Sequence, residues 1–482
     1  MADSLDVEII ACEKTPLLHA SSNRTIKSRR CHLCVIGKIL FAVVVVTLVY
    51  GFLSSIQKPD PSHAPLLHGP HPAFPAAGAT LNYTKHELVH LDISQRPYWP
   101  ISNDVGVWET LDGCHYNWNS TGKIVLARGT PDQEHNFVFD VKVSASSRTA
   151  LDSVSTAIRQ DQHEFYVRCL EWPGVQDLHA TDRAWNWSAA VHVDVRVLVK
   201  PGTLLFGSFK TWTNNLGIEV APGLDFESNH MSLRSRSGSL VGTEVDTFTP
   251  RSITLYSQVG SIVGTWSLAQ TIILQTGDWR NSNAPINVDL IPKRWSSGPT
   301  TGGVLQVRST GGDIDIRMPF ARNKVSLRNT SIDISSSTGS ISGTFVTGIH
   351  TLLETGGNGT IDAVLLPYFG LPLTSKIATS TEAGSTSIEV LSPLVDEYSG
   401  VQPLLDTRSE HTSASGNMSL KYPLEWAGLA IGVSDAGHVS VAGIGVDNVV
   451  KDDYIVVGRR GTGMGSRLDF TTHSGHAELV IE

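Results

Sequence analysis

Apolar and polar residues alternate along the segment from Ala184 to Lys200, which reads AWNWSAAVHVDVRVLVK. A period of two residues is typical of a β-strand that buries one face. The apolar face of this predicted strand carries Trp185, Trp187, Ala189 and the valines at 191, 193, 195, 197 and 199. The opposite face carries Asn186, Ser188, His192, Asp194 and Arg196. The pattern predicts a long strand with one face in the core and the other in water.

A second pattern recurs beyond residue 225: a short alternating strand, a turn centred on Gly or Ser, and a second alternating strand. Its nine copies cover residues 232–245, 252–266, 304–318, 331–345, 352–366, 379–391, 412–422, 431–443 and 469–481. The turn glycines include Gly238, Gly260, Gly312, Gly339, Gly384, Gly416, Gly437 and Gly475. Glycine at such a turn relieves the steric cost of a positive φ or of a tight corner.

The copy at 304–318 shows how each unit divides its residues between core and solvent. Leu305, Val307, Ile314, Ile316 and Met318 share one face, and Asp313, Asp315 and Arg317 share the other. Short repeated units that bury only half of their surface must stack on their neighbours. The predicted fold class is therefore all-β, a β-solenoid or β-roll of stacked repeats. An antiparallel β-sandwich is the alternative, because Gly-centred turns between short strands are also hairpin signals.

One uncharged apolar run, Ile39 to Ile56, differs from everything else in the chain. As a helix it would extend about 27 Å, close to the thickness of a bilayer's hydrocarbon core. Lys27, Arg29, Arg30 and Lys38 precede it, so the positive-inside rule places the N-terminus in the cytosol. We expect an uncleaved signal-anchor helix at 35–56 that crosses the membrane. Residues 1–34 before it are expected to form a disordered cytosolic tail.

Composition divides the remainder of the chain into three parts. Six prolines between 59 and 75 predict a stiff stalk, which we place at 57–90. Seven of the eleven tryptophans lie between Trp99 and Trp212 and mark a Trp-rich β domain at 91–225. The Gly/Ser-rich β-repeat domain occupies 226–482.

Net charge restricts the partners of the part beyond residue 58. The whole chain has a net charge of -9, and residues 1–58 hold seven Lys/Arg and four Asp/Glu. The remaining 30 basic and 42 acidic residues give -12. A nucleic acid or an anionic lipid surface requires a basic footprint, so neither is an expected partner of this part.

The five cysteines fall on both sides of the predicted membrane span. Cys114 and Cys169 are the two on the oxidising side, and we expect them to form a disulfide. Cys31 and Cys34 lie beside the membrane without a second ligand pair, so palmitoylation is a better interpretation than a zinc or redox site. Unmodified thiols are the alternative.

Two kinds of short motif bear on where the protein is located. Glu13, Leu17 and Leu18 match the acidic dileucine signal that sorting adaptors bind, and a solvated tail without such a role is the alternative. N-glycosylation sequons begin at Asn82, Asn119, Asn186, Asn329, Asn358 and Asn417. The expected location is a plasma membrane or an endosomal or vacuolar membrane.

Candidate chemistry in the repeats is sparse. Asp313 and Asp315 share a strand face, a placement suited to paired acid and base carboxylates, and Asp333 and Asp362 in the following units are candidate partners. A solvated sheet face would have the same pattern. His473 and His476 lack a third nearby ligand and are interpreted as turn histidines. We expect no cofactor, no metal and no catalytic residue.

The repeats resemble a known family. The units SSTGSISG, SQVGSIVG and SRSGSLVG follow the serial S-x-x-G-x-I/V-x-G pattern of the putative-adhesin domain family of unknown function, which occurs in bacterial and fungal membrane or secreted proteins. The resemblance covers residues 230–482 and implies a β-solenoid-like scaffold with no established activity. The tail, anchor and stalk resemble a fungal-type single-pass version.

Together these patterns predict a type II single-pass membrane glycoprotein with a non-catalytic β-repeat ectodomain. Its expected role is adhesion, scaffolding or binding, with carbohydrate or protein as ligand and a sorting adaptor at the tail. A carbohydrate-active β-helix enzyme is the alternative, as is a structural glycoprotein without a dedicated ligand.

Overall fold

The computed structural model describes residues 80–93, 104–111, 119–160, 162–169, 190–243, 249–277, 283–292, 303–320, 330–368, 374–394, 404, 406–452, 454–462 and 465–482. Residues 74–482 group into one compact unit. In the described part no helix is long and apolar enough to cross a membrane, and the apolar run at 39–56 lies outside that part. The predicted tail, sorting motif and lipidation site also lie outside it.

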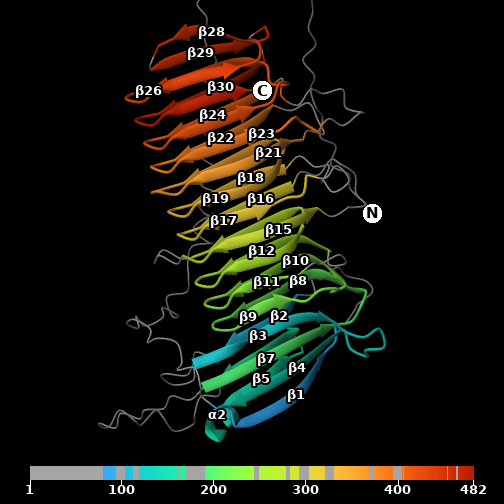
Figure 1. Ribbon diagram of the computed structural model, residues 1–482. Helices are drawn as coiled ribbons and strands as arrows, with labels where there is room; N and C mark the ends of the chain where they lie inside the picture. Colours follow the sequence, from blue (N-terminus) through green and yellow to red (C-terminus); the bar gives the residue numbers. More distant parts are fainter. Residues whose placement is uncertain are drawn as a thin grey trace, which may run out of the picture. The chain divides into compact units, whose positions relative to one another are not determined.

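Two large β-sheets contain almost all of the regular structure among these residues (Figure 1). Sheet A has the spatial order β1 (Tyr83–Leu91), β4 (Phe137–Ala145), β7 (Ala190–Val199), β3 (Asn119–Arg128), β9 (Gly217–Val220), β11 (Leu240–Gly242), β13 (Ile262–Leu268), β15 (Ile286–Pro292), β17 (Ile314–Arg317), β19 (Ile341–Thr347), β21 (Ile361–Pro367), β23 (Thr386–Val390), β25 (Met418–Tyr422), β31 (Ala477–Ile481) and β27 (Val439–Gly443).

Sheet B has the spatial order β28 (Val446–Lys451), β29 (Ile455–Arg460), β26 (Gly428–Ser434), β30 (Ser466–Thr472), β24 (Thr407–Ser413), β22 (Ser375–Thr381), β20 (His350–Thr355), β18 (Thr330–Ser336), β16 (Gly303–Ser309), β14 (Thr271–Thr276), β12 (Thr249–Ser257), β10 (Phe226–Ser235), β8 (Thr203–Thr213), β2 (Val105–Thr110), β6 (Glu164–Cys169) and β5 (Val154–Arg159). One short helix, α2 (Arg148–Ser153), follows β4, and Ser147 caps it by accepting a hydrogen bond from the Ala150 amide.

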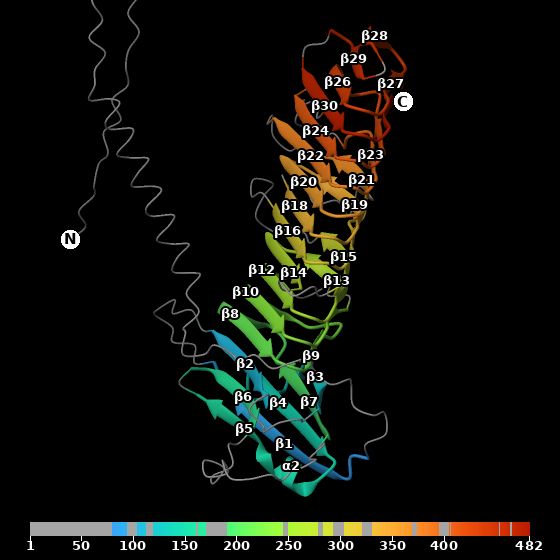
Figure 2. The ribbon, with the colours of Figure 1, turned by 90° about the vertical axis from the view of Figure 1, so that its left-hand side faces the viewer.

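Successive strands from β8 to β28 alternate between the two sheets, as the two layers in Figure 2 show. Strand β10 pairs in parallel with β8 and β12, and β11 pairs in parallel with β9 and β13. The two strands that flank the turn at Gly238 therefore lie in opposite sheets and are not paired with each other. Each copy of the repeat adds one strand to each sheet.

Both ends of the stack depart from this rule. Near the start, β1 pairs antiparallel with β4, and β4 pairs antiparallel with β7. Strand β1 begins at Tyr83, inside the range 57–90 expected to form a stalk, because alternating residues of this segment pack on β4. At the other end, β30 lies between β24 and β26, so the last copy of the repeat inserts between the two preceding copies.

The core lies between the two sheets and follows the alternation in the sequence. Val191, Val193, Val195, Val197 and Val199 on β7 are all buried, as predicted. In the copy at 304–318 the five predicted core residues are at most 3% exposed, while Asp313 and Arg317 are exposed. Trp185, Trp187 and Ala189 lie outside the described residues. Each sheet contains strands from before and from after residue 226. The domain boundary at residue 225 stays a prediction.

The turn glycines are needed for a reason that the sequence did not reveal. None of the eight has a positive φ. Instead, the turns stack so closely that a Cβ on Gly384 would lie 1.8 Å from the carbonyl oxygen of Gly359, and one on Gly416 would lie 1.8 Å from that of Gly384. Backbone contact between coils therefore excludes every larger residue from these positions.

A buried hydroxyl three residues before the glycine supports five of these turns, those at Gly238, Gly339, Gly416, Gly437 and Gly475. Ser336 Oγ accepts a hydrogen bond from the Gly339 amide at 2.9 Å and donates to the carbonyl oxygen of Gly312 in the preceding coil at 3.4 Å. Ser235 makes the same two contacts, with the Gly238 amide at 2.8 Å and the Leu216 carbonyl at 3.0 Å. The first serine of the S-x-x-G unit thus bonds within its own turn and to the coil before it.

Candidate functional site

An open concavity of about 690 Å³ lies on the outer face of sheet A, where β1, β4, β7, β3 and β9 are neighbours. Its lining is Thr84, His86, Val125, Ala127, Asp140, Lys142, Asp194, Val195, Arg196, Glu219 and Ala221. These strands carry polar residues outward because the alternate positions, including Val141 and Val193, are buried in the core. A rigid sheet therefore holds the lining in place.

Opposite charges adjoin each other across this concavity. Asp140 is in register with Arg196, and Lys142 with Asp194, on the paired strands β4 and β7. His86 is paired with Asp140, and Lys123 Nζ lies 2.7 Å from Glu219 Oε2. The hydrogen bond that Lys123 donates to Glu219 raises the pKa of Lys123. The site is a mixed-charge surface that suits a polar ligand able to match both signs.

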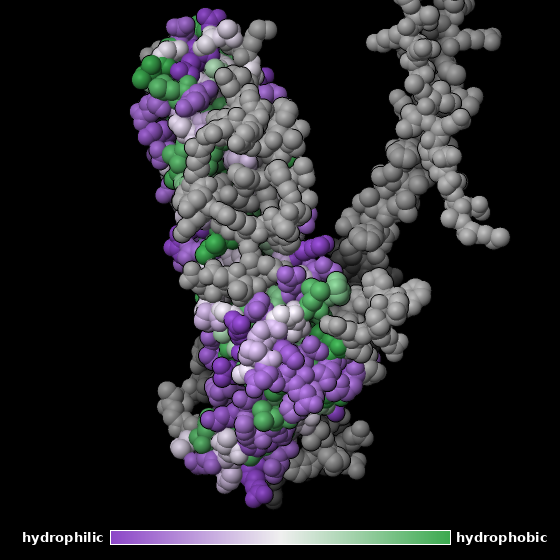
Figure 3. Space-filling model, turned by 90° about the vertical axis from the view of Figure 1, so that its right-hand side faces the viewer, coloured by the Kyte–Doolittle hydropathy of each residue, from purple (hydrophilic) through white to green (hydrophobic). Residues whose placement is uncertain are grey.

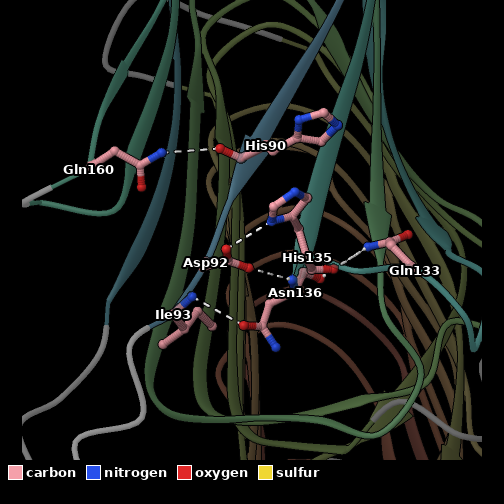
Figure 4. A network of polar contacts seen from close by, with 7 residues as sticks. All are labelled: His90, Asp92, Ile93, Gln133, His135, Asn136 and Gln160. Carbon is pink, nitrogen blue, oxygen red and sulfur yellow. Dashed lines mark hydrogen bonds and ion pairs between the residues drawn. The ribbon is translucent and has the colours of Figure 1, made fainter.

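A compact hydrogen-bond network closes the end of the β1–β4 pair beside this face (Figure 4). His135 Nδ1 lies 2.8 Å from Asp92 Oδ2, and the His135 ring stacks on His90 with centroids 4.6 Å apart. The Ile93 amide donates to Asn136 Oδ1, and Gln133 Nε2 donates to the Leu198 carbonyl on β7. These bonds position the loop before β4 and are structural in character.

Two opposing effects act on Asp92 in this network. Partial burial raises the pKa of the Asp92 carboxyl. The hydrogen bonds from His135 and from the Asn136 amide, together with the charge of His135, lower this pKa by a larger amount. The net pKa is below the ordinary value for an aspartate. Asp92 is therefore ionised throughout the neutral range and keeps the loop attached to β1.

The predicted carboxylate pair lies elsewhere on sheet A. Arg317 Nε is 2.6 Å from Asp289 Oδ1, and its Nη1 is 3.4 Å from Asp315 Oδ2. Asp313 Oδ1 accepts a hydrogen bond from the Ser340 amide at 2.8 Å. Both carboxylates thus have structural partners.

The two other candidate carboxylates are placed differently with respect to this pair. Asp362 lies two strands from Asp315, in one row with Ser342 between them. Asp333 is on β18 in sheet B, so it does not share the face of Asp313 and Asp315. Of the four carboxylates, the structure aligns Asp315 and Asp362 and leaves Asp333 apart.

His473 and His476, interpreted as turn histidines, are both exposed and have different partners. His473 Nδ1 lies 2.7 Å from Asp435 Oδ2, whereas His476 stacks on His438 with centroids 5.3 Å apart. In the described ranges no cluster of three or more His, Cys, Asp or Glu could hold a metal ion.

The remaining predicted sites are described only in part. Cys169 ends β6 and takes part in a disulfide. Cys114 lies outside the described residues, so its pairing with Cys169 stays a prediction. Asn82, Asn358 and Asn417 are exposed, and Asn186 and Asn329 lie outside the described residues. Asn119 opens β3, but its side chain is not described.

Sequence reasoning did not identify the concavity, although one of its strands was predicted. The sequence places Asp194 and Arg196 on the solvent-facing side of their strand, but it does not indicate that Asp140 and Lys142 adjoin them. The two segments are about 50 residues apart and pair antiparallel. Alternation of charged residues along both segments is the signal that could have suggested a shared face.

No protein-family model matches the chain, and no curated protein is significantly similar to it. Among solved structures it is similar to a putative cell adhesion protein from Clostridium sporogenes, at 8% identity over 83% of this chain and 100% of that one, with a TM-score of 0.14. It is also similar to a putative adhesin from Bacteroides fragilis, at 9% identity over 70% and 97% of the two chains, with a TM-score of 0.23. A putative lipid binding protein from Parabacteroides distasonis is similar at 10% identity over 64% and 97%, also with a TM-score of 0.23.

Proposed function

We propose that this protein is a type II single-pass membrane glycoprotein whose ectodomain is a non-catalytic binding or adhesion scaffold. We propose a β-solenoid for this scaffold, and the parallel strand that each described copy of the repeat adds to each of two sheets supports this proposal. Its fungal-type anchoring and its location at the plasma membrane or an endosomal or vacuolar membrane rest on the sequence alone.

The mixed-charge concavity on sheet A is the observation that carries the binding role. Its lining comes mainly from five neighbouring strands, and the surface is open to solvent. On the face of the molecule in Figure 3 the described residues are mostly hydrophilic, with hydrophobic ones scattered among them. Such a surface favours contact with a polar macromolecule, carbohydrate or protein, over enclosure of a small substrate.

The rival enzyme function has less support. A glycoside hydrolase needs two carboxyl groups about 5 to 9.5 Å apart on either side of a substrate bond. Asp315 and Asp362 lie two strand spacings apart, about 10 Å between backbones, but Asp315 is paired with Arg317 and contacts Ser342. Because Asp315 already has partners on the sheet, this face is more consistent with a structural role.

Topology is tested by protease treatment of intact cells that express the full chain with a tag at each end. The proposal predicts that the C-terminal tag is digested and the N-terminal tag is protected. Protection of the C-terminal tag together with loss of the N-terminal tag would contradict it.

Replacement of Leu17 and Leu18 by alanine tests sorting separately, because a genuine dileucine signal predicts redistribution to the cell surface.

The binding role is tested with the full-length protein in lipid nanodiscs on arrays of defined glycans and of extracellular proteins. Arg196→Ala and Lys142→Ala, combined, should reduce the strongest signal roughly tenfold, a loss of about 1.4 kcal/mol. Arg408→Ala, an exposed arginine on β24 of sheet B, is the matched control. A double variant that binds like the unmodified protein would exclude the concavity as the contact surface.

A further inference from the structure

A row of aromatic and arginine residues crosses the outer face of sheet B at the opposite side of the core from the concavity. Trp108 on β2 is in register with Tyr166 on β6 and with Trp212 on β8. Arg234 on β10 is in register with Trp212 and with Tyr256 on β12. Since paired strands lie about 4.8 Å apart, the five side chains form one row that runs perpendicular to the strands.

The row continues with polar residues and then reaches an acidic one. Tyr256 is in register with Gln275, and Gln275 with Arg308 on β16. Beyond Arg308 the same row passes through Ser335 to Glu354. The aromatic–arginine row, defined as Tyr166, Trp108, Trp212, Arg234, Tyr256 and Arg308, therefore spans seven strands, or about 29 Å.

These side chains face solvent because the residues beside them in each strand fill the core. Val107, Val167, Thr211, Leu233 and Leu255 are all at most 2% exposed. Trp212 is 37% exposed, and Arg234 and Arg308 are exposed as well. An aromatic side chain that stays this accessible on a sheet face is available for contact with a ligand.

The indoles are held in defined positions. A Cβ added to Gly106 would lie 2.5 Å from Trp108 Nε1, so the indole of Trp108 lies over Gly106, along its own strand. Trp212 Nε1 donates to Asn214 Oδ1 at 3.4 Å. At the end of the row, the guanidinium of Arg159 lies 5.0 Å from the centroid of the Tyr166 ring. The glycine makes room for a flat aromatic surface on the sheet.

Charge on this face is mainly positive near the row. Within the described part of the chain, neither Arg234 nor Arg308 forms an ion pair; Arg234 Nε donates to Ser232 Oγ at 3.2 Å. Nearby carboxylates are already engaged: Asp104 Oδ2 lies 2.6 Å from Lys210 Nζ, and Glu164 accepts from the Tyr166 hydroxyl. Two arginines thus remain available to an anionic ligand.

We infer that this row binds an extended acidic polysaccharide, one that carries uronate carboxylates, along the axis of the stack. Pyranose rings present apolar faces that pack on Trp and Tyr, and carboxylates form charge-assisted hydrogen bonds with arginine. A strand spacing close to the length of one sugar ring lets successive residues of the polymer meet successive strands. The inference rests on the proposed placement of the ectodomain outside the cytosol.

A single-stranded nucleic acid also stacks on aromatic residues in a basic groove. The proposed placement of the ectodomain outside the cytosol disfavours it, because carbohydrate polymers are the common polyanions there. It is therefore an outcome of the test.

The test measures binding of the full-length protein in nanodiscs to immobilised polygalacturonate, to its fully methyl-esterified form and to a single-stranded DNA of equal length. We expect the strongest binding to polygalacturonate, weakened at high salt. Trp212→Ala should weaken it roughly tenfold to hundredfold, the range typical of one lost stacking contact. Phe206→Ala, an exposed aromatic on the same strand but off the row, is the matched control and should bind unchanged.

Arg234→Ala combined with Arg308→Ala removes the available cations without changing the aromatic surface. This variant should lose the preference for polygalacturonate over the esterified form, whereas Arg251→Ala, exposed on β12, should keep it. Equal binding of both polymers by the unmodified protein, unchanged binding by Trp212→Ala, or tighter binding of DNA would overturn the inference. These results would leave the concavity on sheet A unaffected, so the two proposals fail separately.

Discussion

At the residue scale, the repeat is determined by contacts between successive backbones. The sequence predicted which residues of the copy at 304–318 face the core, because apolar and polar positions alternate there. It did not predict that the turn glycines avoid a clash with the preceding coil, since that clash depends on how copies stack.

Gly384→Ala should be strongly destabilising. Its new Cβ would lie 1.8 Å from the Gly359 carbonyl oxygen, and backbone cannot yield as a side chain can. We expect a loss of roughly 2 to 4 kcal/mol in the free energy of unfolding, measured from urea midpoints. Gly303→Ala is the control, since a Cβ there meets only the Thr330 side chain at 3.6 Å. Equal midpoints for the two variants would contradict the stacking of turns.

Polar residues also occupy the core, which hydropathy alone could not predict. Thr407, Ser409, His411 and Ser413 are the buried residues of β24. The His411 ring bonds to Thr379 Oγ1 at 2.9 Å and to the Tyr422 hydroxyl at 3.0 Å, across the core from sheet B to sheet A. Burial lowers the pKa of His411 to about 3 and raises the pKa of Tyr422.

Stability should therefore decrease as the pH falls below 6.5. An unfolded histidine binds a proton near pH 6.5, whereas His411 in the folded chain stays neutral down to about pH 3. Between these values the unfolded state holds more protons, so the free energy of unfolding falls by about 1.4 kcal/mol per pH unit from this group. His411→Gln should flatten the dependence of the urea midpoint on pH between 6.5 and 4.5. A variant with the slope of the unmodified protein would show that His411 is protonated in the fold.

At the element scale, the first coil depends on one buried carboxylate. Glu109 on β2 is fully buried, and its Oε2 accepts from the amides of Asn214 and Asn215 while Oε1 accepts from that of Leu111. It thereby ties the turn between β8 and β9 to a strand about 100 residues earlier in the chain. Sequence alone gave no sign of this link, because a glutamate within VGVWET looks like a solvated residue.

Glu109→Gln should lower the free energy of unfolding by roughly 2 to 3 kcal/mol. Hydrogen bonds to a charged acceptor are stronger than those to a neutral one. In addition, the NH₂ group of the glutamine side chain would face backbone N–H groups, which are also donors. The measurement is again the urea midpoint, supported by the rate of limited proteolysis near residues 214 and 215. Glu227→Gln, exposed on β10, serves as the control. A change no larger than that of the control would exclude the proposed tie.

The order in which the last copies of the repeat stack is a second feature that could not be predicted from the sequence. The last copy, with β30 and β31, lies between the copies that contain β24 and β26. All three copies have the same alternation and a turn glycine, so any of them could have stacked on the others. Which copies become neighbours depends on the long connections between them, such as the antiparallel pair β28 and β29.

At the scale of the whole molecule, the fold depends on parallel stacking of copies in preference to hairpins. Both arrangements bury the same residues, and this is why the sequence left a β-solenoid and an antiparallel sandwich open. They differ in which outward-facing positions become neighbours. Gln306 and Asp333 are in register on β16 and β18, whereas Arg308 and Asp315 flank one turn and lie in different sheets.

Engineered cysteine pairs measure this difference directly. A disulfide needs Cα atoms about 4.4 to 6.8 Å apart, which neighbouring parallel strands provide at these positions. Gln306→Cys with Asp333→Cys should form an intramolecular disulfide, identified by peptide mass mapping, while Arg308→Cys with Asp315→Cys should stay reduced under the same mild oxidation. A disulfide in the second pair and none in the first would establish hairpins and contradict the stacked coils.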